Sequence, residues 1–399
     1  GEYHGAGGPL AVADQSEPHP LCDAFIEAGA ASGHPRNEDF NGAAQEGFGY
    51  YQLTTRRGLR CSTAKAYLKP ARGRRNLTVL TGALVTRVCC AGRRASGVEW
   101  RRGDTAWQAE AGCEVILAGG AINTPQLLEL SGIGSAALLA QHGLPLVHDL
   151  PGVGECLQDH LQVRTVFRCT RPITFNDDMR NPVRQLKVGL QYVLQRKGPL
   201  SVSAGYAGAF LRTAPELARP DVQVHFITFS TTKMGDALHS FSGFTASVCQ
   251  LRPESRGSVH ITTADVARPP QIRCNYLAAE ADRQVTVAGL QQLRRIMQAG
   301  PLRPYVAEEM EPGPACASDE QVLEYCRERG ASIYHPTCTA RMGEDPLAVV
   351  DARLRVHGME RLRIADGSIM PTLVSGNSNA AIIMIGEKAA DLILEDRAK

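Results

Sequence analysis

Two segments in the middle of the chain alternate apolar and polar residues. Residues 222–226 read Val-Gln-Val-His-Phe, and residues 244–248 read Phe-Thr-Ala-Ser-Val. A period of two places the apolar side chains of a strand on one face and the polar ones on the other. The middle of the chain therefore predicts an antiparallel sheet with one buried and one solvated face.

Three other segments carry the start and stop signals of helices. Residues 20–31 begin with Pro20, which suits the first turn of a helix. Apolar residues recur at helical spacing between about 279 and 299, and the capping box Ser318-x-x-Gln321 opens a helix that ends at Gly330. We expect the last two helices to cover one face of the sheet.

A different pattern, in which a strand, a glycine turn and a helix follow one another, occupies residues 114–132. Residues 76–80 and 114–117 are short β-rich runs, and the second leads through Gly119 and Gly120 into a helix. Thr124 suits the N-cap of that helix and Pro125 its first residue. Such a unit belongs to a parallel sheet.

The end of the chain repeats this pattern. Residues 362–365 are a short apolar strand, Asp366-Gly367 is a turn, and a helix is expected from about Asn379 to Leu394. The chain thus enters a parallel sheet on both sides of the antiparallel region. We therefore expect two discontinuous domains.

Composition limits the class of protein. The chain has 399 residues and a formal net charge of +2, and 43% of its residues are hydrophobic. These values are typical of a globular protein of about two domains, and they do not favour nucleic acid as a partner. No apolar run reaches the ~18 residues that a membrane-spanning helix needs.

Cysteines and basic residues add two expectations. The 12 cysteines are scattered without the spacing of a zinc site, so we assign no metal and expect reduced thiols in the cytoplasm. Residues 56–75 hold eight basic residues, no acidic one and a single aromatic residue, too few for a nucleic-acid stacking platform. A solvated basic face is the simpler interpretation, and a peripheral contact with an anion or a membrane surface is the alternative.

Several common catalytic motifs are absent from the sequence. There is no G-x-G-x-x-G dinucleotide fingerprint, because Leu10 and Leu157 stand where its third glycine would follow Gly5 and Gly152. There is no G-x-S-x-G motif, and His335 has no second histidine at metal-ligand spacing. A serine hydrolase and a zinc protease therefore have no support.

One long segment, Gly120 to Gly134, carries a resemblance to a known family. It reads Gly-Ala-Ile-Asn-Thr-Pro-Gln-Leu-Leu-Glu-Leu-Ser-Gly-Ile-Gly and resembles the second signature of the glucose-methanol-choline (GMC) flavin oxidoreductases. Further motifs follow in family order at residues 149–154, at Gln158-Asp159-His160, and at residues 334–343, 365–371 and 375–380. Residues 249–257 resemble the alcohol and choline dehydrogenase branch.

The resemblance includes one departure. The family begins with a βαβ unit whose glycine fingerprint binds the FAD pyrophosphate, and Gly1 aligns just after that portion. About 150 residues of the family pattern would then be absent, on the scale of one domain. We therefore expect the chain to lack the N-terminal FAD-binding portion, and a non-catalytic remnant that acts as a binding or interaction module is the alternative to an enzyme.

The fold class implied by the resemblance is mixed, α/β and α+β. An incomplete Rossmann-like FAD-binding domain would be interleaved with a substrate domain built on the antiparallel sheet and covered by helices. The implied segments are a leader or cap region over 1–60, an FAD-domain segment over 61–160, a substrate-binding domain over 161–335 and a C-terminal FAD-domain segment over 336–399.

The resemblance also implies a reaction, the FAD-dependent oxidation of a small primary alcohol to an aldehyde. His335 corresponds to the family's catalytic base, and an imidazole with an ordinary pKa of about 6.5 can take the alcohol proton at neutral pH while hydride goes to flavin N5. Asn377 corresponds to the second catalytic position, where a donor can stabilise charge on the substrate oxygen. From the residues alone, a structural histidine and a turn-forming asparagine remain alternatives.

Contacts with the flavin half of FAD are implied near the end of the chain. Asp366 and Gly367 correspond to the turn beside the pyrophosphate and ribityl chain, where glycine permits close approach. Asn377, Ser378 and Asn379 begin a helix whose N-terminus suits the anionic pyrimidine ring of the reduced flavin. An ordinary Asp-Gly turn is the alternative for the first pair.

Contacts with the rest of FAD, and the fate of the electrons, follow from the same resemblance. Val85 would meet the adenine, although a valine in isolation is more often a core residue, and Ala118 and Gly119 lie at a strand end where such sheets bind ligands. Electrons would pass to a quinone or another acceptor.

Overall fold

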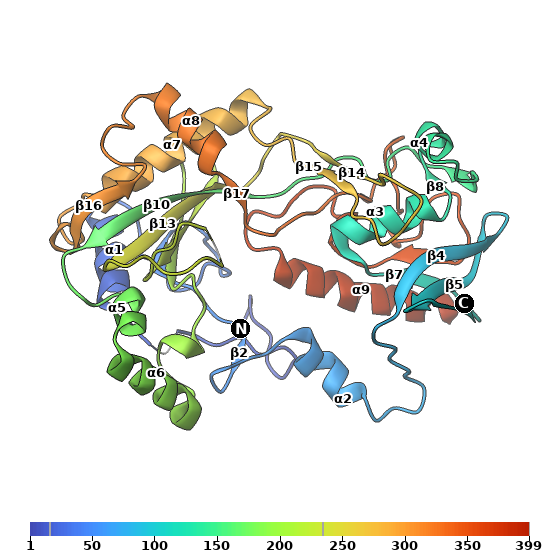
Figure 1. Cartoon of the computed structure of the whole chain (residues 1–399), viewed down its shortest axis with the longest axis horizontal. Coiled ribbons are helices and arrows are strands. Elements are labelled where there is room, and N and C mark those ends of the chain that lie inside the picture. The colour runs from blue at the N-terminus through green and yellow to red at the C-terminus, as the bar shows by residue number, and fades with distance from the viewer. Residues whose placement is uncertain (16, 234, 399) are drawn as a thin grey trace. The chain divides into compact units, whose positions relative to one another are not determined.

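The computed structural model describes residues 1–15, 17–233 and 235–398, and the chain divides into two compact units (Figure 1). Unit 1 comprises Gly1–Leu77, Leu161–Leu251 and Arg283–Ala331, and unit 2 comprises Thr78–His160, Arg252–Asp282 and Ser332–Lys399. Each unit is therefore built from three separate stretches of chain. The division into FAD and substrate segments stays a prediction, because compactness does not identify a ligand.

Unit 1 is organised around an antiparallel sheet with the strand order β1-β11-β12-β13-β10-β16. Val224 pairs with Val248 and Phe226 with Ala246, so the two segments with a period of two are adjacent strands. The predicted antiparallel sheet is confirmed. Its strands are Gly47–Tyr50 (β1), Leu161–Cys169 (β10), Ala207–Leu211 (β11), Val222–Ile227 (β12), Gly243–Gln250 (β13) and Val306–Glu311 (β16).

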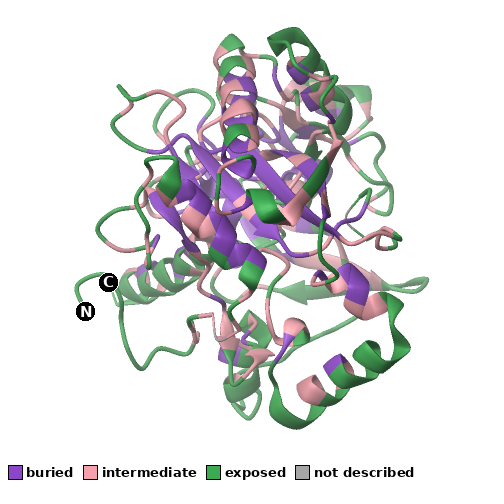
Figure 2. Ribbon diagram, turned by 90° about the vertical axis from the view of Figure 1, so that its left-hand side faces the viewer, coloured by how far each residue is buried: buried purple, intermediate pink, exposed green. Residues whose placement is uncertain are grey.

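The expected solvated face of this sheet is wrong, because its polar side chains are buried. Gln223 and Ser247 are fully buried, and Figure 2 shows buried residues along the central strands. Their polar groups have partners: Gln223 Nε2 donates to the Tyr51 hydroxyl at 3.0 Å, and Gln162 Nε2 donates to Ser247 Oγ at 2.7 Å. These hydrogen bonds offset the free-energy cost of burying polar groups. The alternation of residue types along a strand does not reveal such partners.

Two helices cover the apolar face of the sheet. Helix α1 (Pro20–Ala31) places Phe25 on Phe226, with ring centroids 4.6 Å apart. Helix α7 (Glu280–Met297) approaches closely at Gly289, where a Cβ would lie 3.0 Å from the Val222 side chain and 3.1 Å from that of Val248. The predicted helices at these positions are confirmed.

The predicted capping box also forms. Helix α8 (Asp319–Arg329) begins after Ser318, whose backbone N–H donates to Gln321 Oε1 at 3.0 Å while Gln321 N–H donates to Ser318 Oγ. Gly330 is its C-cap, and Tyr325 donates from the helix to the Arg164 carbonyl of β10 at 2.6 Å.

The remaining elements of unit 1 are one helix of 14 residues, α6 (Pro182–Gln195), and several elements of two to six residues. The eight basic residues within 56–75 are exposed. No helix among the described residues is both long enough and apolar enough to cross a membrane. The short elements are β2 (Thr55–Arg56), β3 (Leu59–Arg60), the π-helical turn η1 (Ala64–Leu68), α2 (Lys69–Ala71), α5 (Phe175–Arg180), η2 (Pro199–Ser201) and η3 (Arg303–Tyr305), with β17 (Ala331–Ser332) following α8.

Unit 2 contains a parallel pair and a separate antiparallel meander. Strands β7 (Val115–Leu117) and β18 (Leu362–Ile364) are parallel, and the paired residues Leu117 and Ile364 are 247 positions apart in the sequence. The meander β4-β5-β6 spans Leu84–Ala91, Arg94–Arg102 and Thr105–Glu110. Other elements are α3 (Gly120–Leu130), β8 (Ile133–Gly134), α4 (Ala136–Gln141), β9 (His148–Asp149), β14 (Ser258–His260), β15 (Gln271–Arg273), the 3₁₀ turn η4 (Gly367–Ile369) and α9 (Asn379–Arg397).

Strands β7 and β18 come from distant parts of the sequence. The two strands nevertheless lie side by side, because Ala365 N–H donates to the Leu117 carbonyl at 2.8 Å. The predicted strand–turn–helix units at both places are therefore parts of one parallel pair.

Helix α3 begins at Gly120, four residues before the predicted N-cap Thr124. Pro125 therefore lies inside the helix, where it cannot donate to the Ala121 carbonyl. Thr339 compensates, since its hydroxyl donates to that carbonyl at 2.7 Å. The prediction of the helix is confirmed, and its start is corrected because a distant hydroxyl makes an internal proline tolerable.

One predicted strand is absent and one predicted helix is present. Residues 76–80 form no strand, and Val79 and Leu80 are exposed, because the segment pairs with no strand in the described part of the chain. Helix α9 begins at the predicted Asn379 and continues to Arg397, slightly beyond the predicted end.

Candidate functional site

The ends of β7 and β18 bring several predicted site residues together in unit 2. Ala118 and Gly119 follow β7, and Asp366 and Gly367 follow β18. Because the two strands are parallel, their carboxyl ends lie at the same edge, which is where open parallel sheets bind ligands.

Asp366 organises this edge. It is buried, its Oδ2 accepts hydrogen bonds from Gly120 N–H at 2.9 Å and from the Thr124 hydroxyl at 2.7 Å, and its Oδ1 accepts from Ser368 N–H at 2.8 Å. The carboxylate therefore joins the first residues of α3 to the turn after β18. Gly367 is also buried, and a Cβ there would lie 3.1 Å from the Ile382 side chain of α9.

His335 lies in a loop that a second buried carboxylate holds. Its backbone N–H donates to Asp159 Oδ1 at 2.9 Å, and the same oxygen accepts from His160 N–H at 2.9 Å. Asp159 Oδ2 accepts from the Tyr276 hydroxyl at 2.5 Å. Asp159 therefore joins three segments of unit 2 around His335.

The imidazole of His335 is half-buried and faces another histidine. Its Nδ1 lies 3.0 Å from Nδ1 of the fully buried His160, with the two rings edge to face. One of these nitrogens must carry the shared proton. Burial lowers the pKa of His335, and the charge of Asp159 opposes this only in part, so the neutral imidazole is favoured.

Gln158 links the His335 loop to the loop before Asn377. Its Oε1 accepts from Leu373 N–H at 3.0 Å, and its backbone carbonyl accepts from Thr337 N–H at 2.9 Å. The side chain is buried, and its Nε2 donates to the Pro253 carbonyl at 2.6 Å. The segment that carries His335 and the one that carries Asn377 are thus connected through one residue, by its backbone carbonyl and by its side chain.

Three predicted residues lie at the start of α9. Asn377 and Asn379 are exposed, whereas Ser378 is buried and is the N-cap of the helix. The first turn of a helix has backbone N–H groups without intrahelical acceptors and a partial positive charge. This place therefore offers several donors to a ligand.

Val85 lies at the start of β4, outside these groups. It is half-buried and pairs with Trp100 of β5. Its proposed contact with adenine stays a prediction.

The donors at the strand ends and at the start of α9 fit a flavin cofactor. The buried hydroxyl of Ser368, beside Asp366, has no hydrogen-bond partner within the described residues. Gly120 has φ +75°, and a Cβ there would meet no atom within 4 Å, so backbone and ligand could approach closely. Neutral donors and open glycine backbone suit the polar edge of a flavin or a phosphate.

Sequence reasoning assigned no role to Asp159, His160 or Tyr276. The first two stand in the Gln158-Asp159-His160 motif, so the motif was a usable signal. Nothing in the sequence marks Tyr276, because its contact with Asp159 joins positions far apart in the chain.

Comparisons with known proteins identify the family. Two family models match, both described as GMC oxidoreductase, the N-terminal one over residues 3–162 and the C-terminal one over residues 253–386. The expectation that the chain lacks the N-terminal portion is therefore not borne out. The absence of a six-residue glycine motif was too narrow a basis for that expectation. The N-terminal family model extends over residues 3–162 and matches without that motif.

Curated relatives bear the name oxygen-dependent choline dehydrogenase. The protein from Escherichia coli O17:K52:H18 (strain UMN026 / ExPEC) is 43% identical over 397 residues, which cover 98% of this chain and 71% of the relative. The protein from Escherichia coli O45:K1 (strain S88 / ExPEC) is 42% identical, with 98% of this chain and 70% of the relative covered.

Solved structures share the fold. Pyridoxine 4-oxidase from Mesorbium loti is 30% identical with a TM-score of 0.86, and the match covers 97% of this chain and 72% of that chain. Formate oxidase of Aspergillus oryzae RIB40 is 25% identical with a TM-score of 0.91, with 98% and 73% covered. The predicted mixed fold is confirmed.

These matches decide between the two hypotheses drawn from the sequence. Both family models and relatives at 43% identity favour an enzyme over a non-catalytic remnant. The predicted class, an FAD-dependent oxidoreductase that acts on alcohols, is confirmed. This chain belongs to the GMC oxidoreductase family.

Proposed function

We propose that this protein oxidises a small primary alcohol of the choline type to the aldehyde, with His335 as the base. The observation that carries the proposal is the placement of His335. Its loop is fixed by Asp159, its Nδ1 faces His160, and burial lowers its pKa.

The arrangement gives His335 a defined chemical role. Because Nδ1 faces His160, Nε2 is the nitrogen that takes the hydroxyl proton of the substrate. A lowered pKa keeps the imidazole neutral at neutral pH, which is the state that a general base requires. Asp159 fixes the backbone of His335 and so limits the positions that the ring can adopt.

Asn377 and the start of α9 would stabilise the negative charge that develops on the substrate oxygen and on the reduced flavin. The Asn377 amide would donate to the substrate oxygen as it loses its proton. Ser378, Asn379 and the turn at Asp366-Gly367 would hold FAD, together with Ala118 and Gly119, and Val85 would contact its adenine. When bound, FAD supplies the acceptor for the hydride that leaves the alcohol carbon.

Substrate, electron acceptor and location are parts of the same proposal. The choline type rests on relatives that bear the name choline dehydrogenase. We propose a quinone or another carrier as the electron acceptor. The 12 cysteines form no disulfide, which supports the cytoplasm as the location.

Flavin reduction tests the role of His335. With the protein loaded with FAD, stopped-flow absorbance under anaerobic conditions should show reduction by choline, and His335→Ala should slow it by about 10² to 10⁴-fold. His142→Ala, which changes a histidine after α4, is the matched control and should keep the parent rate. Equal rates in the parent and His335→Ala would refute the assignment.

A further inference from the structure

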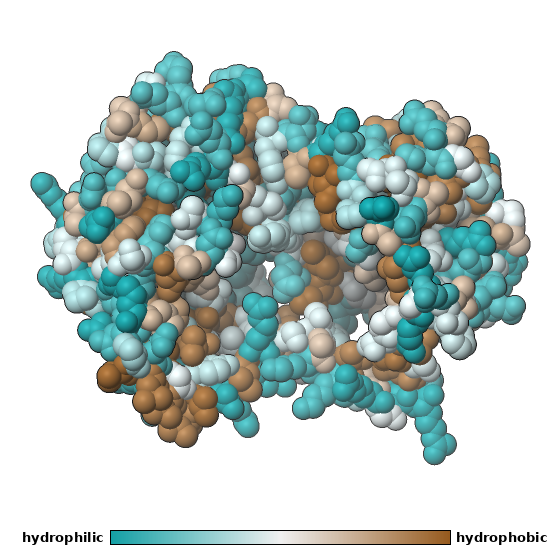
Figure 3. All heavy atoms as spheres, viewed as in Figure 1, coloured by the Kyte–Doolittle hydropathy of each residue, from teal (hydrophilic) through white to brown (hydrophobic). Residues whose placement is uncertain are grey.

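Helix α6 has an apolar face that the rest of the described chain does not cover. Figure 3 shows this face as a brown cluster at the lower left, where Figure 1 labels α6. The only buried residue of the helix is Val188, which points the other way. The exposed apolar residues follow helical spacing and are Val183 (77% exposed), Leu186 (64%), Leu190 (49%), Val193 (63%) and Leu194 (75%).

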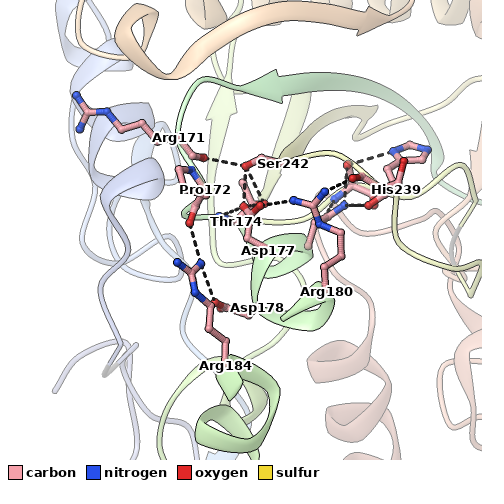
Figure 4. Close-up of polar contacts among 12 residues, drawn as sticks. Arg171, Pro172, Thr174, Asp177, Asp178, Arg180, Arg184, His239 and Ser242 are labelled. Carbon is pink, nitrogen blue, oxygen red and sulfur yellow. Dashed lines mark hydrogen bonds and ion pairs between the residues drawn. The ribbon is translucent and has the colours of Figure 1, made fainter. Parts of the chain in front are cut away.

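The base of this helix is fixed by a polar cluster that includes α5 (Figure 4). Asp177 Oδ2 accepts from the Thr174 hydroxyl at 2.7 Å and from the Ser242 hydroxyl at 2.6 Å. Asn181 Oδ1 caps α6 by accepting from Val183 N–H at 3.0 Å. The apolar face is therefore presented on an anchored helix.

The same cluster neutralises the acidic residues that precede α6. Arg180 donates to Asp177 at 2.5 Å, and Arg184 lies 3.8 Å from Asp178 while donating to the Pro172 carbonyl at 3.0 Å (Figure 4). The charge that remains on and beyond the helix is positive.

Basic side chains border the apolar face. No acidic residue occurs in the sequence from 179 to 215, whereas Lys187, Arg196 and Lys197 lie on or directly after α6 and are exposed. Gly58 of the β2–β3 turn packs against the Arg196 carbonyl, which places the exposed Arg57 next to this border. The surface thus combines an apolar stripe with a positive border.

We propose that α6 docks the protein on the surface of a membrane that contains anionic lipids. Leucine and valine side chains would enter the boundary between headgroups and acyl chains, and the lysines and arginines would contact lipid phosphates, as in interfacial amphipathic helices. A second copy of the chain fits this face less well, because it would bring the same cations together without a carboxylate from either helix. The proposal does not depend on the role of His335.

Vesicle sedimentation of the purified full chain tests the proposal. The protein should sediment with vesicles of phosphatidylcholine and phosphatidylglycerol, and far less with phosphatidylcholine alone. The double variant Leu190→Ser, Leu194→Ser should lower the affinity at least about tenfold because it removes buried apolar area. Lys187→Gln and Lys197→Gln should each lower it about fivefold.

Controls separate docking from unfolding and from self-association. Val12→Ser changes an exposed apolar residue elsewhere in unit 1 and should bind like the parent. All variants should keep the parent thermal transition by circular dichroism. Absence of vesicle binding, unchanged binding of the double variant, or a parent dimer in light scattering that this variant converts to a monomer would overturn the proposal.

Discussion

Strands β12 and β13 of unit 1 are held by apolar side chains that recur along each strand. Strands β7 and β18 of unit 2 span three residues each and also pack in an apolar core, but a buried carboxylate joins the segments that follow them. In unit 1, Phe226 packs between Phe25 and Phe244, with ring centroids 4.6 and 5.6 Å away. In unit 2, Asp366 and Asp159 each join segments that are far apart in the chain.

This difference between the units indicates which contacts serve stability alone and which also position the candidate site. Apolar packing tolerates many residue types, provided that volume and pattern are kept. Buried carboxylates need particular donors at particular distances, and they also place His335 and the strand-end turns. We therefore expect substitutions in the unit 1 core to change stability mainly, and substitutions of the unit 2 carboxylates to change stability and cofactor binding together.

The largest expected effect tests the apolar side of the comparison. Phe226→Ala should lower the free energy of unfolding by about 3 to 5 kcal/mol, because it removes a fully buried ring and leaves a cavity. Denaturant unfolding followed by circular dichroism measures this change. Val12→Ala, at an exposed position of the same unit, should have little effect, and a comparable loss there would contradict the argument from burial.

The secondary structure of unit 1, where apolar packing dominates, was also the part of the fold that the sequence predicted well. The period of two in residues 222–226 and 244–248 gave the paired strands, and the Ser318-x-x-Gln321 box marked the start of α8. The same alternation predicted a wet face wrongly, because Gln223 and Ser247 are buried through partners such as Tyr51 that the local pattern does not contain.

A second prediction tests the polar side. Asp366→Ala should lower the free energy of unfolding by about 3 kcal/mol, because it leaves Gly120 N–H, Ser368 N–H and the Thr124 hydroxyl without their acceptor. The same variant should also bind FAD more weakly, as measured by fluorescence titration. Phe226→Ala, assayed while folded, should keep the parent affinity for FAD, and an equal loss in both variants would remove the distinction between the units.

A site could be proposed from the sequence only where a motif carried it. His335, Asp366 and Asn377 were assigned to the candidate site through segments that resemble a family, not through their local chemistry. Burial of His335, its contact with His160 and the bond from Tyr276 to Asp159 depend on how distant segments meet. Periodicity and capping signals describe single elements, so they could not report these contacts.

A third prediction concerns pH and a histidine of unit 2. His260 Nδ1 lies 2.7 Å from the buried Glu129 and its Nε2 lies 3.2 Å from Glu155, and the hydrogen bond with Glu129 raises the pKa of His260 in the folded state. This stabilisation is present below the unfolded pKa of about 6.5 and is lost as pH rises through the higher folded value. Unfolding free energies measured from pH 6 upward should fall by at most about 1.4 kcal/mol per pH unit from this group.

The control for that prediction is His260→Gln, which keeps a polar side chain but cannot titrate. The unfolding free energy of the parent minus that of the variant should decline as pH rises. Parallel curves for the two proteins would mean that His260 does not contribute to the pH dependence.

The smallest expected effect tests whether a charged pair of unit 2 contributes to stability when it is exposed and not buried. Arg87 and Glu99 form a two-pronged pair on the surface of the meander, at 2.8 and 2.7 Å, and their side chains are 56% and 32% exposed. Water screens such a pair, and holding two long side chains in place costs entropy, so Arg87→Ala should lower the free energy of unfolding by less than about 1 kcal/mol. Denaturant unfolding of this variant beside Asp366→Ala measures both effects under one set of conditions. If the exposed pair proved as costly to break as the buried carboxylate contacts, burial would not explain why the carboxylates of unit 2 matter.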